Sequence, residues 1–368
     1  MHATYSYNRR LQPSTMRVTH TNGTVVLLDL TYSYLQGSVN NGNVVSITNN
    51  LSTGRTQSFT YDELNRLKTA QSQATSGTHC WGQSYGYDRY GNLLTTTVTK
   101  CSAPAPCYSL NSGNQLYKTC SEGSQTLFYD VAGNLTNDHG VTYTWNAEGR
   151  VASTAGVTYT YDGDGRRVKK SNGKLYWYGL SGEVLTETDL AGNTITDYIY
   201  FQGRRIARRD AAGAVYYFFS DHLGSARVIT NSTGAIQRES DFYPFGEERV
   251  VSGTLDDPNK FAGMYYDTES ALYHTLYGHY SPTLGRWLSP DPVRCCEDDP
   301  QAFDRYTYIL DNPTNLTDPF GLQPCNPFTG DPDREPGPVD VVGLPGCGRH
   351  NAGVAPSPVD CNCILTGG

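Results

Sequence analysis

The sequence Tyr216-Tyr-Phe-Phe-Ser-Asp-His-Leu-Gly-Ser225 opens the stretch that decides the fold of this chain. Three more blocks follow it in order: Tyr243-Pro-Phe-Gly246, Gly285-Arg-Trp-Leu-Ser-Pro-Asp-Pro292 and Asn312-Pro-Thr-Asn-Leu-Thr-Asp-Pro-Phe-Gly-Leu322. The residues before Tyr216 repeat a short aromatic pattern centred on glycine. The residues after Leu322 are rich in proline, glycine and aspartate, which favour loops. The stretch from Tyr216 to Leu322 therefore separates a repetitive region from an irregular tail.

The repeated unit has the form Tyr-Asp-x-x-Gly-(Asn/Arg)-(Leu/Val). It is complete in Tyr87-Asp-Arg-Tyr-Gly-Asn-Leu93 and Tyr129-Asp-Val-Ala-Gly-Asn-Leu135, and variants of it occupy residues 61–67, 145–151 and 161–167. The Asp or Asn side chain can hydrogen-bond the backbone of a turn, and glycine supplies the positive φ that the turn needs. The flanking aromatic and aliphatic residues place bulk on one face of each strand. The unit therefore predicts a β-hairpin rather than a carbohydrate-binding platform.

The spacing of the units predicts how the hairpins stack. Tyr129, Trp145 and Tyr161 are 16 residues apart, and the glycines from Gly182 to Gly234 recur every 10 or 11 residues. Such a period is too short for helical hairpins and fits strand-turn-strand units. A single hairpin cannot bury its apolar face alone, so successive hairpins must share a sheet. We expect Tyr129, Trp145 and Tyr161 at equivalent positions on one face of that sheet.

The composition agrees with an all-β chain. The 28 tyrosines outnumber the 11 phenylalanines and 4 tryptophans together, and only 17% of the 368 residues are charged. A net charge of −8 argues against a nucleic-acid partner, because phosphate binding needs clustered positive charge. The basic pairs Arg166-Arg167 and Arg204-Arg205 are therefore interpreted as solvated faces or ion pairs within the fold. No apolar run is long enough to cross a membrane, and the first residues do not resemble a signal peptide.

Ten cysteines are many for a reducing compartment and favour disulfides in an exported protein. Zinc is the alternative, but the sequence has no Cys-x-x-Cys pair and its histidines are scattered. Residues 71–127 look like long hairpin loops, and among their cysteines Cys101 with Cys107 or Cys80 with Cys120 are the expected pairs. The other cysteines are Cys295, Cys296, Cys325, Cys347, Cys361 and Cys363. We predict neither a metal site nor a cofactor. A short helix is expected at residues 300–309, ended by Asn312-Pro313.

The blocks quoted above resemble, in their order, the core segment that ends the shell of RHS/YD-repeat proteins. That group includes bacterial RHS polymorphic toxins, Tc-toxin C subunits and the shell of animal teneurins. The resemblance implies a long meandering sheet of hairpins that spirals into a hollow shell, closed by a C-terminal plug. It divides the chain into a strand-rich N-terminal shell segment (1–54), YD repeats with a cysteine-containing insertion (55–215), the RHS repeat-associated core (216–322) and a variable, irregular tail (323–368).

The resemblance also implies that the chain cuts itself between Leu322 and Gln323. Asp291 and Asp318 each precede a proline, and two carboxylates held together can share a proton and hydrolyse a peptide bond. Arg286 matches a family arginine that could stabilise the anion or orient a carboxylate. The alternative is that both aspartates cap turns. One departure from the family stands against a dyad, because residues 293–305 replace a short glycine-rich link and would misplace the two aspartates. Elsewhere in this segment, Gly278 replaces a usual arginine and Leu284 stands where a polar residue is common. Asp221, His222 and Ser225 are too local in sequence for a hydrolase triad.

The predicted function is a shell that encapsulates and presents a C-terminal, toxin-like segment, with no activity on a diffusible substrate. Its expected partners are its own tail as cargo, upstream repeats of a longer precursor and a component of a secretion system. The sequence begins in mid-pattern, so we expect a fragment of a longer array. The expected location is secreted or at the cell surface. A surface adhesion or carbohydrate-binding protein and an inactive remnant of an RHS toxin are the alternatives.

Overall fold

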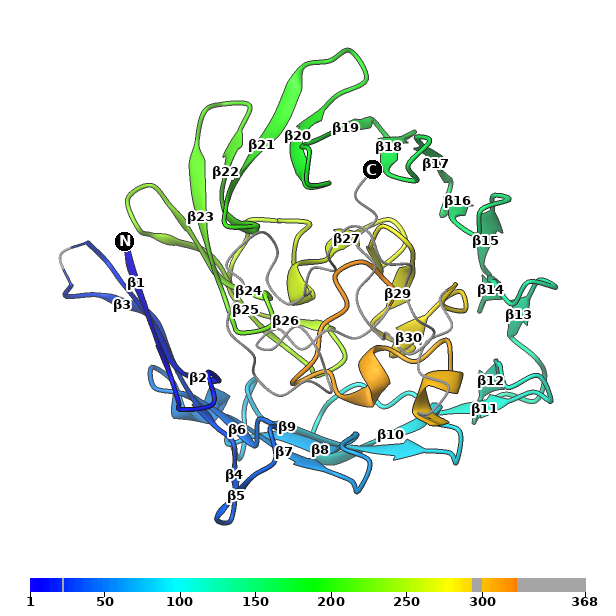
Figure 1. The fold of residues 1–368 in the computed structure, drawn as a ribbon, viewed down its shortest axis with the longest axis horizontal. Helices are drawn as coiled ribbons and strands as arrows, with labels where there is room; N and C mark the ends of the chain where they lie inside the picture. Colours follow the sequence, from blue (N-terminus) through cyan, green and yellow to red (C-terminus); the bar gives the residue numbers. More distant parts are fainter. Residues whose placement is uncertain (22, 293–299, 323–368) are drawn as a thin grey trace, which may run out of the picture.

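The computed structural model describes residues 1–292, apart from residue 22, and residues 300–322. Most of the regular secondary structure in this part is antiparallel strand, and its helical elements are four short 3-10 turns. Two large sheets form a wall that curls around a central plug (Figure 1). The all-β shell predicted from the repeats is confirmed. The calls on Cys295, Cys296 and the four cysteines of the tail lie outside the described residues.

The first sheet contains eight strands in the order β1-β2-β3-β6-β7-β8-β9-β10. Their bounds are β1 His2–Tyr7, β2 Pro13–Thr19, β3 Val26–Ser33, β6 Ser46–Asn49, β7 Gln57–Tyr61, β8 Leu67–Ser72, β9 Trp81–Tyr87 and β10 Leu93–Cys101. A small hairpin of β4 (Leu35–Gln36) and β5 (Val39–Asn40) precedes β6, and the turn η1 (Thr53–Arg55) precedes β7. Each strand pairs with its neighbour in antiparallel register, so the sheet is a meander.

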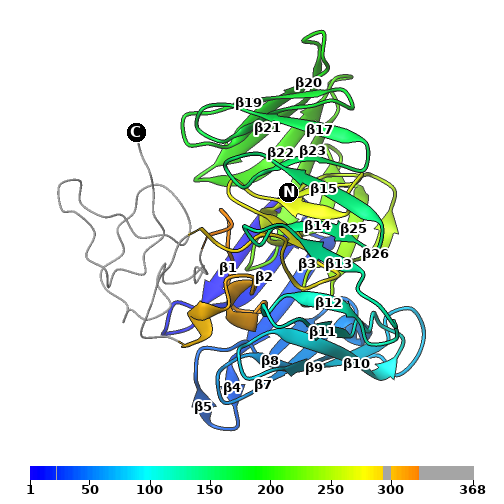
Figure 2. The same cartoon turned by 90° about the vertical axis from the view of Figure 1, so that its right-hand side faces the viewer.

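The second sheet contains fourteen strands, β13 to β26, in sequence order. A hairpin of β11 (Tyr108–Leu110) and β12 (Leu116–Thr119) precedes it. The bounds are β13 Leu127–Tyr129, β14 Leu135–Asp138, β15 Val141–Trp145, β16 Val151–Thr154, β17 Val157–Tyr161, β18 Arg167–Lys170, β19 Lys174–Tyr178, β20 Val184–Thr188, β21 Thr194–Phe201, β22 Arg204–Asp210, β23 Val215–Ser220, β24 Ala226–Asn231, β25 Ile236–Phe242 and β26 Glu248–Gly253. Figure 2 shows these strands climbing one above another from β13 toward β19 and β20.

The plug comprises the described residues from 254 to 322. It contains a four-stranded sheet of β27 (Tyr265–Asp267), β28 (Leu272–His274), β29 (His279–Ser281) and β30 (Arg286–Trp287), with the turns η2 (Phe261–Gly263), η3 (Pro300–Phe303) and η4 (Ile309–Asp311). Figure 1 shows β27, β29, β30 and the two orange turns inside the ring of the wall. The plug core is aromatic: Tyr273, Tyr280, Trp287 and Tyr308 are all buried there.

The repeated turn is built as its residue types predict. In the unit that begins at Tyr129, Oδ1 of Asp130 accepts hydrogen bonds from the amides of Ala132 and Asn134, each at 2.9 Å. Gly133 has a φ of +91°. A side chain there would also collide with Tyr306 of the plug, because a Cβ atom would lie 2.6 Å from its hydroxyl oxygen. Glycine is therefore needed both for the turn and for the contact with the plug.

The aromatic residue of each unit ties its hairpin to the preceding one, and we call this contact the aromatic hook. Trp145 Nε1 donates to the carbonyl of Leu135 (2.7 Å), Tyr161 donates to Val151 (2.7 Å) and Tyr178 donates to Arg167 (2.9 Å). Tyr129, Trp145 and Tyr161 follow the same register shift in their strands and pack against one core cluster. Their predicted equivalence is confirmed.

Two expectations about local structure are wrong. Residues 71–127 contain β9, β10, β11 and β12 rather than long loops, because the polar Ser and Thr residues there lie on strands. Residues 300–309 do not form one helix. Between η3 and η4 the chain makes a turn, in which the amide of Thr307 donates to the carbonyl of Asp304 (3.2 Å). Thr307 then forms an isolated bridge with Arg286 of β30, and the amide of Trp287 donates to the carbonyl of Tyr306 (2.9 Å). Pairing with β30 takes the backbone groups that a helix would use.

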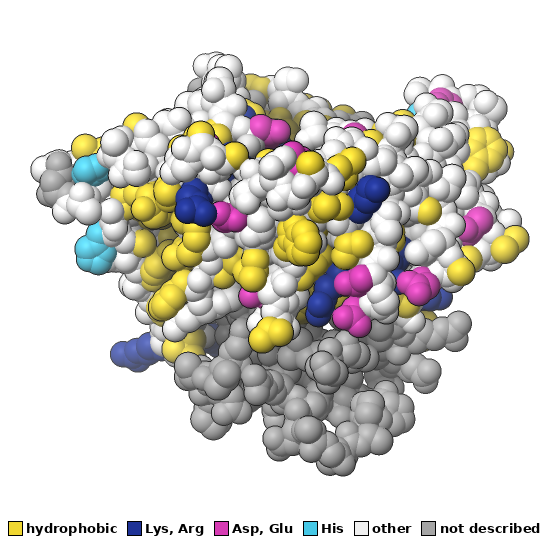
Figure 3. Space-filling model, turned by 90° about the horizontal axis from the view of Figure 1, so that it is seen from above, with side chains coloured by type: hydrophobic (Ala, Val, Ile, Leu, Met, Phe, Trp, Pro, Cys, Tyr) yellow, Lys and Arg dark blue, Asp and Glu magenta, His cyan; other side chains and the backbone are white. Residues whose placement is uncertain are grey.

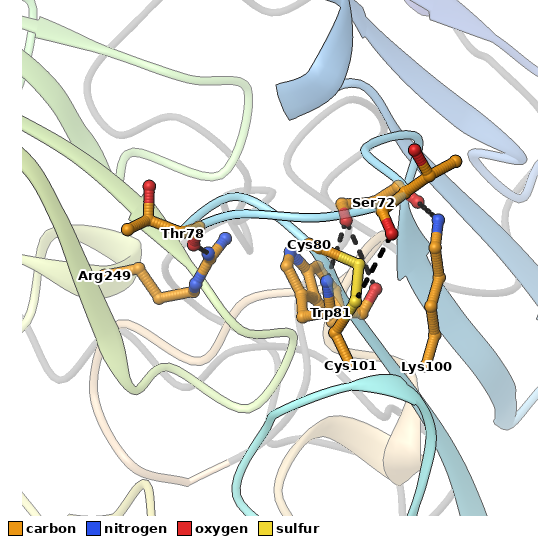
Figure 4. The surroundings of a disulfide bond; sticks show 8 residues. Ser72, Thr78, Cys80, Trp81, Lys100, Cys101 and Arg249 are labelled. Atoms are coloured by element: carbon orange, nitrogen blue, oxygen red, sulfur yellow. Dashed lines mark hydrogen bonds between the residues drawn. A yellow bond between two sulfur atoms is a disulfide. The ribbon is translucent and has the colours of Figure 1, made fainter.

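Among the residues that the structure describes there are two disulfides, but neither is one of the two expected pairs. Cys80 pairs with Cys101 and Cys107 pairs with Cys120, with Cα atoms 5.8 and 5.4 Å apart. The register explains the pairing, because Trp81 is opposite Cys101 in the β9–β10 hairpin and Tyr108 is opposite Thr119 in β11–β12. Each disulfide therefore joins the two ends of one hairpin. Figure 4 shows the first pair beside Trp81, with Ser72 and Lys100 to one side.

Peptide mapping without reduction should recover the Cys80–Cys101 and Cys107–Cys120 cross-links from protein folded under oxidising conditions. Each link closes a short loop, and removing it should lower the free energy of unfolding by about 3 kcal/mol. Denaturant unfolding of the single variants Cys80→Ser and Cys107→Ser measures this cost. Recovery of a peptide that links Cys101 to Cys107 would contradict the register described above.

A buried ion cluster joins the wall to the plug. Asp267 of β27 accepts hydrogen bonds from both terminal nitrogens of Arg167 on β18, at 2.5 and 2.9 Å, and from Lys170 Nζ at 3.0 Å. The side chains of Asp267 and Arg167 are at most 1% exposed. Burial alone would raise the pKa of Asp267, but the positive charges of Arg167 and Lys170 lower it below its usual range. The basic segment around Arg167 is thus an ion pair within the fold, one of the two readings that its sequence allowed.

Replacing Asp267 should be costly, because it would leave the buried Arg167 guanidinium without its partner. We expect Asp267→Asn to lower the free energy of unfolding by about 3–5 kcal/mol. The matched control is Asp164→Asn, since Asp164 is 75% exposed and lies 3.7 Å from Arg166. That control should change stability by about 0.5 kcal/mol or less. Guanidinium unfolding curves of the two variants test the difference, and equal midpoints would contradict it.

The two ends of the wall meet at a seam. Arg55 of η1, in the first half of the chain, makes a two-pronged ion pair with Asp241 of β25, at 2.8 and 2.9 Å. Arg227 of β24 also pairs with Asp241. Leu30 of β3 and Val228 of β24 belong to one buried cluster. The seam closes the wall into a ring.

Candidate functional site

The candidate cleavage site lies at the end of the plug. Asp318 is buried, and its Oδ1 accepts hydrogen bonds from the amides of Gly321 (2.7 Å) and Leu322 (3.1 Å). The amide of Tyr277 donates to the carbonyl of Phe320 (2.9 Å), which ties this turn to the β28–β29 connection. The Asp318 carboxylate is thus hydrogen-bonded to the backbone of Leu322. The carbonyl carbon of Leu322 is the atom that water would attack in the expected self-cleavage.

Gly321 makes this tight turn possible. Its φ is +81°, and a Cβ atom there would lie 2.3 Å from Oγ1 of Thr275 and 3.0 Å from the amide nitrogen of Gly278. Gly278 is crowded as well, since its Cβ would lie 2.7 Å from the Trp287 ring. The Trp287 ring therefore packs where a side chain at position 278 would begin.

Asp291 is half-buried, and Arg305 holds its backbone. The amide of Asp291 donates to the carbonyl of Arg305 (2.8 Å), and the guanidinium of Arg305 donates back to the carbonyl of Asp291 (2.7 Å from Nε). Asp291 follows β30, so the plug sheet positions it from one side. Whether its carboxylate meets that of Asp318 stays a prediction, and Gln323 lies outside the described residues.

Arg286 lies in β30 and faces a carboxylate that the sequence reasoning did not select. Its Nη2 is 3.6 Å from Oδ1 of Asp304 and 3.4 Å from the side-chain oxygen of Asn92, and its guanidinium lies over the ring of Tyr306. Nε and Nη1 of Arg286 are buried and have no hydrogen-bond partner in the described part of the chain. The predicted role of Arg286 toward the dyad therefore remains untested.

Asp304 and Asp311 are buried carboxylic acids that lie close enough to each other and to Arg286 to interact electrostatically. Burial raises the pKa of Asp311 well above its usual range, and the negative charge of Asp304 raises it further. Oδ2 of Asp304 is buried without a partner among the described residues. Sequence reasoning missed both residues, because Asp304 lies where a helix was expected and Asp311 lies between that helix and Asn312-Pro313. The available signal was their acidic character next to the Asn312-Pro313 block.

The Asp221, His222 and Ser225 block is a structural turn, as its local spacing indicated. Oδ1 of Asp221 accepts hydrogen bonds from the amides of Leu223 (3.1 Å) and Ser225 (3.0 Å). His222 Nε2 lies 2.9 Å from the carbonyl of Thr314, and Ser225 Oγ accepts from the amide of Ala262 (3.0 Å). These side chains bind backbone groups of the plug and turn rather than each other.

Two buried histidines lie next to the Asp267 cluster. The rings of His274 and His279 are 4.9 Å apart, and His279 stacks on Tyr159 of β17 at 6.2 Å. Burial lowers the pKa of His279 to about 3, with Arg167 and Lys170 lowering it further and Asp267 opposing them. Burial also lowers the pKa of His274, and the same cations and Arg150 add to this. Both rings are therefore neutral in the folded shell at pH 7.

Acid should destabilise the shell through these histidines. The unfolded chain protonates histidine near pH 6.5, whereas folded His279 stays neutral down to about pH 3. The contribution of neutral His279 to the free energy of unfolding is therefore fully present above pH 6.5 and is lost as the pH falls below that value. At pH 5 His279 alone should account for a loss of about 2 kcal/mol. His279→Phe should reduce the difference between urea midpoints at pH 7.5 and pH 5, whereas His2→Gln, at an exposed residue of β1, should retain it. An unchanged difference in His279→Phe would contradict the assignment.

In the part of the chain that the structure describes, no group of three or more His, Cys, Asp or Glu side chains is placed to hold a metal ion. Within the same residues, no helix is long and apolar enough to cross a membrane.

The wall of hooked hairpins around a plug defines a class of protein, the YD-repeat shells of the RHS type. The family model described as the teneurin YD-shell matches residues 1–314. The chain therefore belongs to the teneurin YD-shell family. The resemblance to RHS/YD-repeat proteins is confirmed.

Particular relatives and structures agree with this class. The chain is 31% identical over 252 residues to the tRNA nuclease WapA of Bacillus subtilis, covering 64% of this chain and 11% of the relative. It is 32% identical over 111 residues to the toxin protein Tse5 of Pseudomonas aeruginosa, covering 29% of this chain and 8% of the relative. A crystal structure of TcdB2-TccC3 without its hypervariable C-terminal region shares the fold, with a TM-score of 0.69 at 21% identity over 87% of this chain and 18% of that chain. The chain spans about a tenth of the curated relatives.

Proposed function

We propose that this chain is a shell that encloses the segment after Leu322 and releases it by cutting the Leu322–Gln323 bond. One observation carries the proposal. The Asp318 carboxylate is buried inside the wall and accepts hydrogen bonds from the amides of Gly321 and Leu322. A carboxylate in that position adjoins the bond to be cut and is sheltered from bulk water.

The proposed chemistry assigns different states to the two aspartates. Two amide hydrogen bonds stabilise the ionised form of Asp318, so Asp318 is the base that takes a proton from water. Asp291 is the acid that donates to the carbonyl oxygen of Leu322. The hydroxyl adds to the carbonyl carbon of Leu322 and gives a neutral gem-diol. Protonated Asp318 then gives its proton to the nitrogen of Gln323, and the C–N bond breaks while Asp291 takes back a proton from one hydroxyl of the gem-diol. Arg286 orients the carboxylate that is ionised at this stage from the β30 side.

The tail that follows Leu322 is the proposed cargo, and it contains 46 residues. Upstream repeats of a longer precursor and a secretion-system component are the proposed outside partners. The proposed location is secreted or at the cell surface. Two disulfides at hairpin ends support it, because such links persist in oxidising compartments.

A second candidate function is adhesion or carbohydrate binding by the outside of the wall. The observation in its favour is a set of exposed aromatic side chains, which includes Trp177 of β19 (55% exposed) and Phe201 of β21 (64%). Figure 3 shows hydrophobic side chains in several groups on the upper face, with charged residues between them. Such aromatic residues can stack on sugar rings. Binding on a glycan array that is lost in Trp177→Ala would favour this function.

Self-cleavage predicts a defined fragment. The purified full chain should lose 46 of its 368 residues, or 46/368 of 40.5 kDa (about 5 kDa), without any added protease. Asp291→Asn and Asp318→Asn should each abolish the loss, because each leaves one carboxylate to act as both acid and base. Asp164→Asn is the control, since its side chain is 75% exposed. Intact mass spectrometry locates the cut.

The outcomes separate the candidates. A fragment that persists in both active-site variants would show that a contaminating protease cuts the tail. An intact wild-type chain would leave a container without a release step, which is what an inactive remnant of a toxin would also give.

A further inference from the structure

The segment just before Asp318 is held by hydrogen bonds from the wall. The amide of Val44 donates to Oδ1 of Asn315 (2.6 Å), and Nδ2 of Asn312 donates to Oδ1 of Asn43 (3.1 Å). Nδ2 of Asn315 donates to the hydroxyl of Tyr61 (3.1 Å). Asn43 and Val44 precede β6, and Tyr61 ends β7. Tyr61 thus belongs to the first sheet, and Asn43 and Val44 lie in the connection that leads into it.

A contact from the other sheet completes this arrangement. Thr314 lies between the two sheets, because its Oγ1 is 2.7 Å from the Tyr61 hydroxyl and its carbonyl is 2.9 Å from His222 Nε2. His222 lies in the turn between β23 and β24, and its ring packs on Tyr32 of β3 at 4.7 Å. We call these residues the seam clamp: Asn43, Val44, Tyr61 and His222 of the wall with Asn312, Thr314 and Asn315 of the plug.

The seam clamp is complete only in a closed wall. Its members are buried or nearly so, and a buried polar group that loses its partner costs free energy. Tyr61 is the centre, because its hydroxyl donates to the carbonyl of Val44 (2.5 Å) while meeting Thr314 and Asn315. If either sheet is displaced, residues 312–315 lose partners that water cannot easily replace.

The seam clamp also determines where Asp318 lies. The amides of Asn315 and Leu316 both donate to the carbonyl of Asn312 (3.2 Å each), so residues 312–316 form one tight turn. Leu316, Thr317 and Asp318 then continue as a buried segment into the turn at Gly321. Only two residues separate the clamped Asn315 from Asp318. A displacement of the seam clamp would therefore also displace the carboxylate of Asp318.

We propose that the seam clamp makes self-cleavage conditional on closure of the shell, with Tyr61 and Thr314 as positioning residues for Asp318. The dependence of cleavage on closure rests on the proposed function. The positioning of Asp318 by Tyr61 and Thr314 does not require that cleavage occurs. An open or incompletely folded shell would keep its tail attached. Cleavage would then follow enclosure rather than precede it.

The test compares variants that remove one hydroxyl at a time in the full chain. Tyr61→Phe and Thr314→Val should slow appearance of the cleaved fragment about tenfold, the effect of one lost buried hydrogen bond. Thr314→Ser retains the hydroxyl and should restore the rate. The matched control is Tyr161→Phe, because Tyr161 donates to Val151 within the wall and belongs to no part of the clamp. It should cleave at the wild-type rate.

A second readout does not depend on cleavage. In the Asp291→Asn background, amide hydrogen exchange of residues 316–322 should be about tenfold faster when Tyr61→Phe or Thr314→Val is added, and unchanged with Thr314→Ser or Tyr161→Phe. With Tyr61→Phe and Thr314→Val, exchange in β13–β18 should stay constant, which separates a local shift from general destabilisation.

The two readouts distinguish the possible failures. If the wild type is not cut but exchange responds to Tyr61→Phe, the proposed self-cleavage is wrong and the positioning stands. If exchange and cleavage are both unaffected by Tyr61→Phe and Thr314→Val, the seam clamp does not position Asp318 and the inference is overturned. Faster exchange throughout the wall would also overturn it, since the hydroxyls would then serve only general stability.

Discussion

The structure depends on pairing buried carboxylates with arginines that come from distant strands. Asp267 of the plug is neutralised by Arg167 of the wall, and Asp257, just before the plug sheet, lies 2.9 Å from Arg208 of β22. At the seam, Asp241 forms a buried ion pair with Arg55. A buried charge without a partner is strongly destabilising. A strand that moved away from its partner would leave such a charge, so each ion pair fixes the position of the strand that carries it. Hydrophobic contacts alone would allow stacked hairpins to slide, whereas these pairs fix the plug within the wall.

The wall itself follows from local rules, which is why its sequence was informative. Asp130 and Gly133 form their turn from residues within one hairpin, and Trp145 reaches only the neighbouring hairpin. Interactions over such short sequence distances repeat wherever the residue pattern repeats. The all-β class, the stacking and the family could therefore be predicted from the pattern.

The site was harder to predict because it depends on register and on distant partners. The pairing of Cys80 with Cys101 requires knowing that β9 and β10 form a hairpin, which the polar composition concealed. Arg286 matches a family position, yet its nearest carboxylate is Asp304, from a segment where a helix was expected. The contact between Asn315 and Val44 spans 271 residues and leaves no local signal. Asp318 was selected from its motif, but its bonds to Gly321 and Leu322 required the structure.

The order in which these contacts can form gives the seam clamp its significance. Hairpins and hooks join near neighbours, so they require little loop closure and can form early. The contacts of Tyr61 with Thr314 and Asn315 span about 250 residues and need both sheets and the plug. They therefore depend on the largest amount of prior structure and should be among the last to form. Only two residues separate Asn315 from Asp318, so these contacts also position the Asp318 carboxylate. The geometry proposed for cleavage is therefore completed at the step that closes the shell.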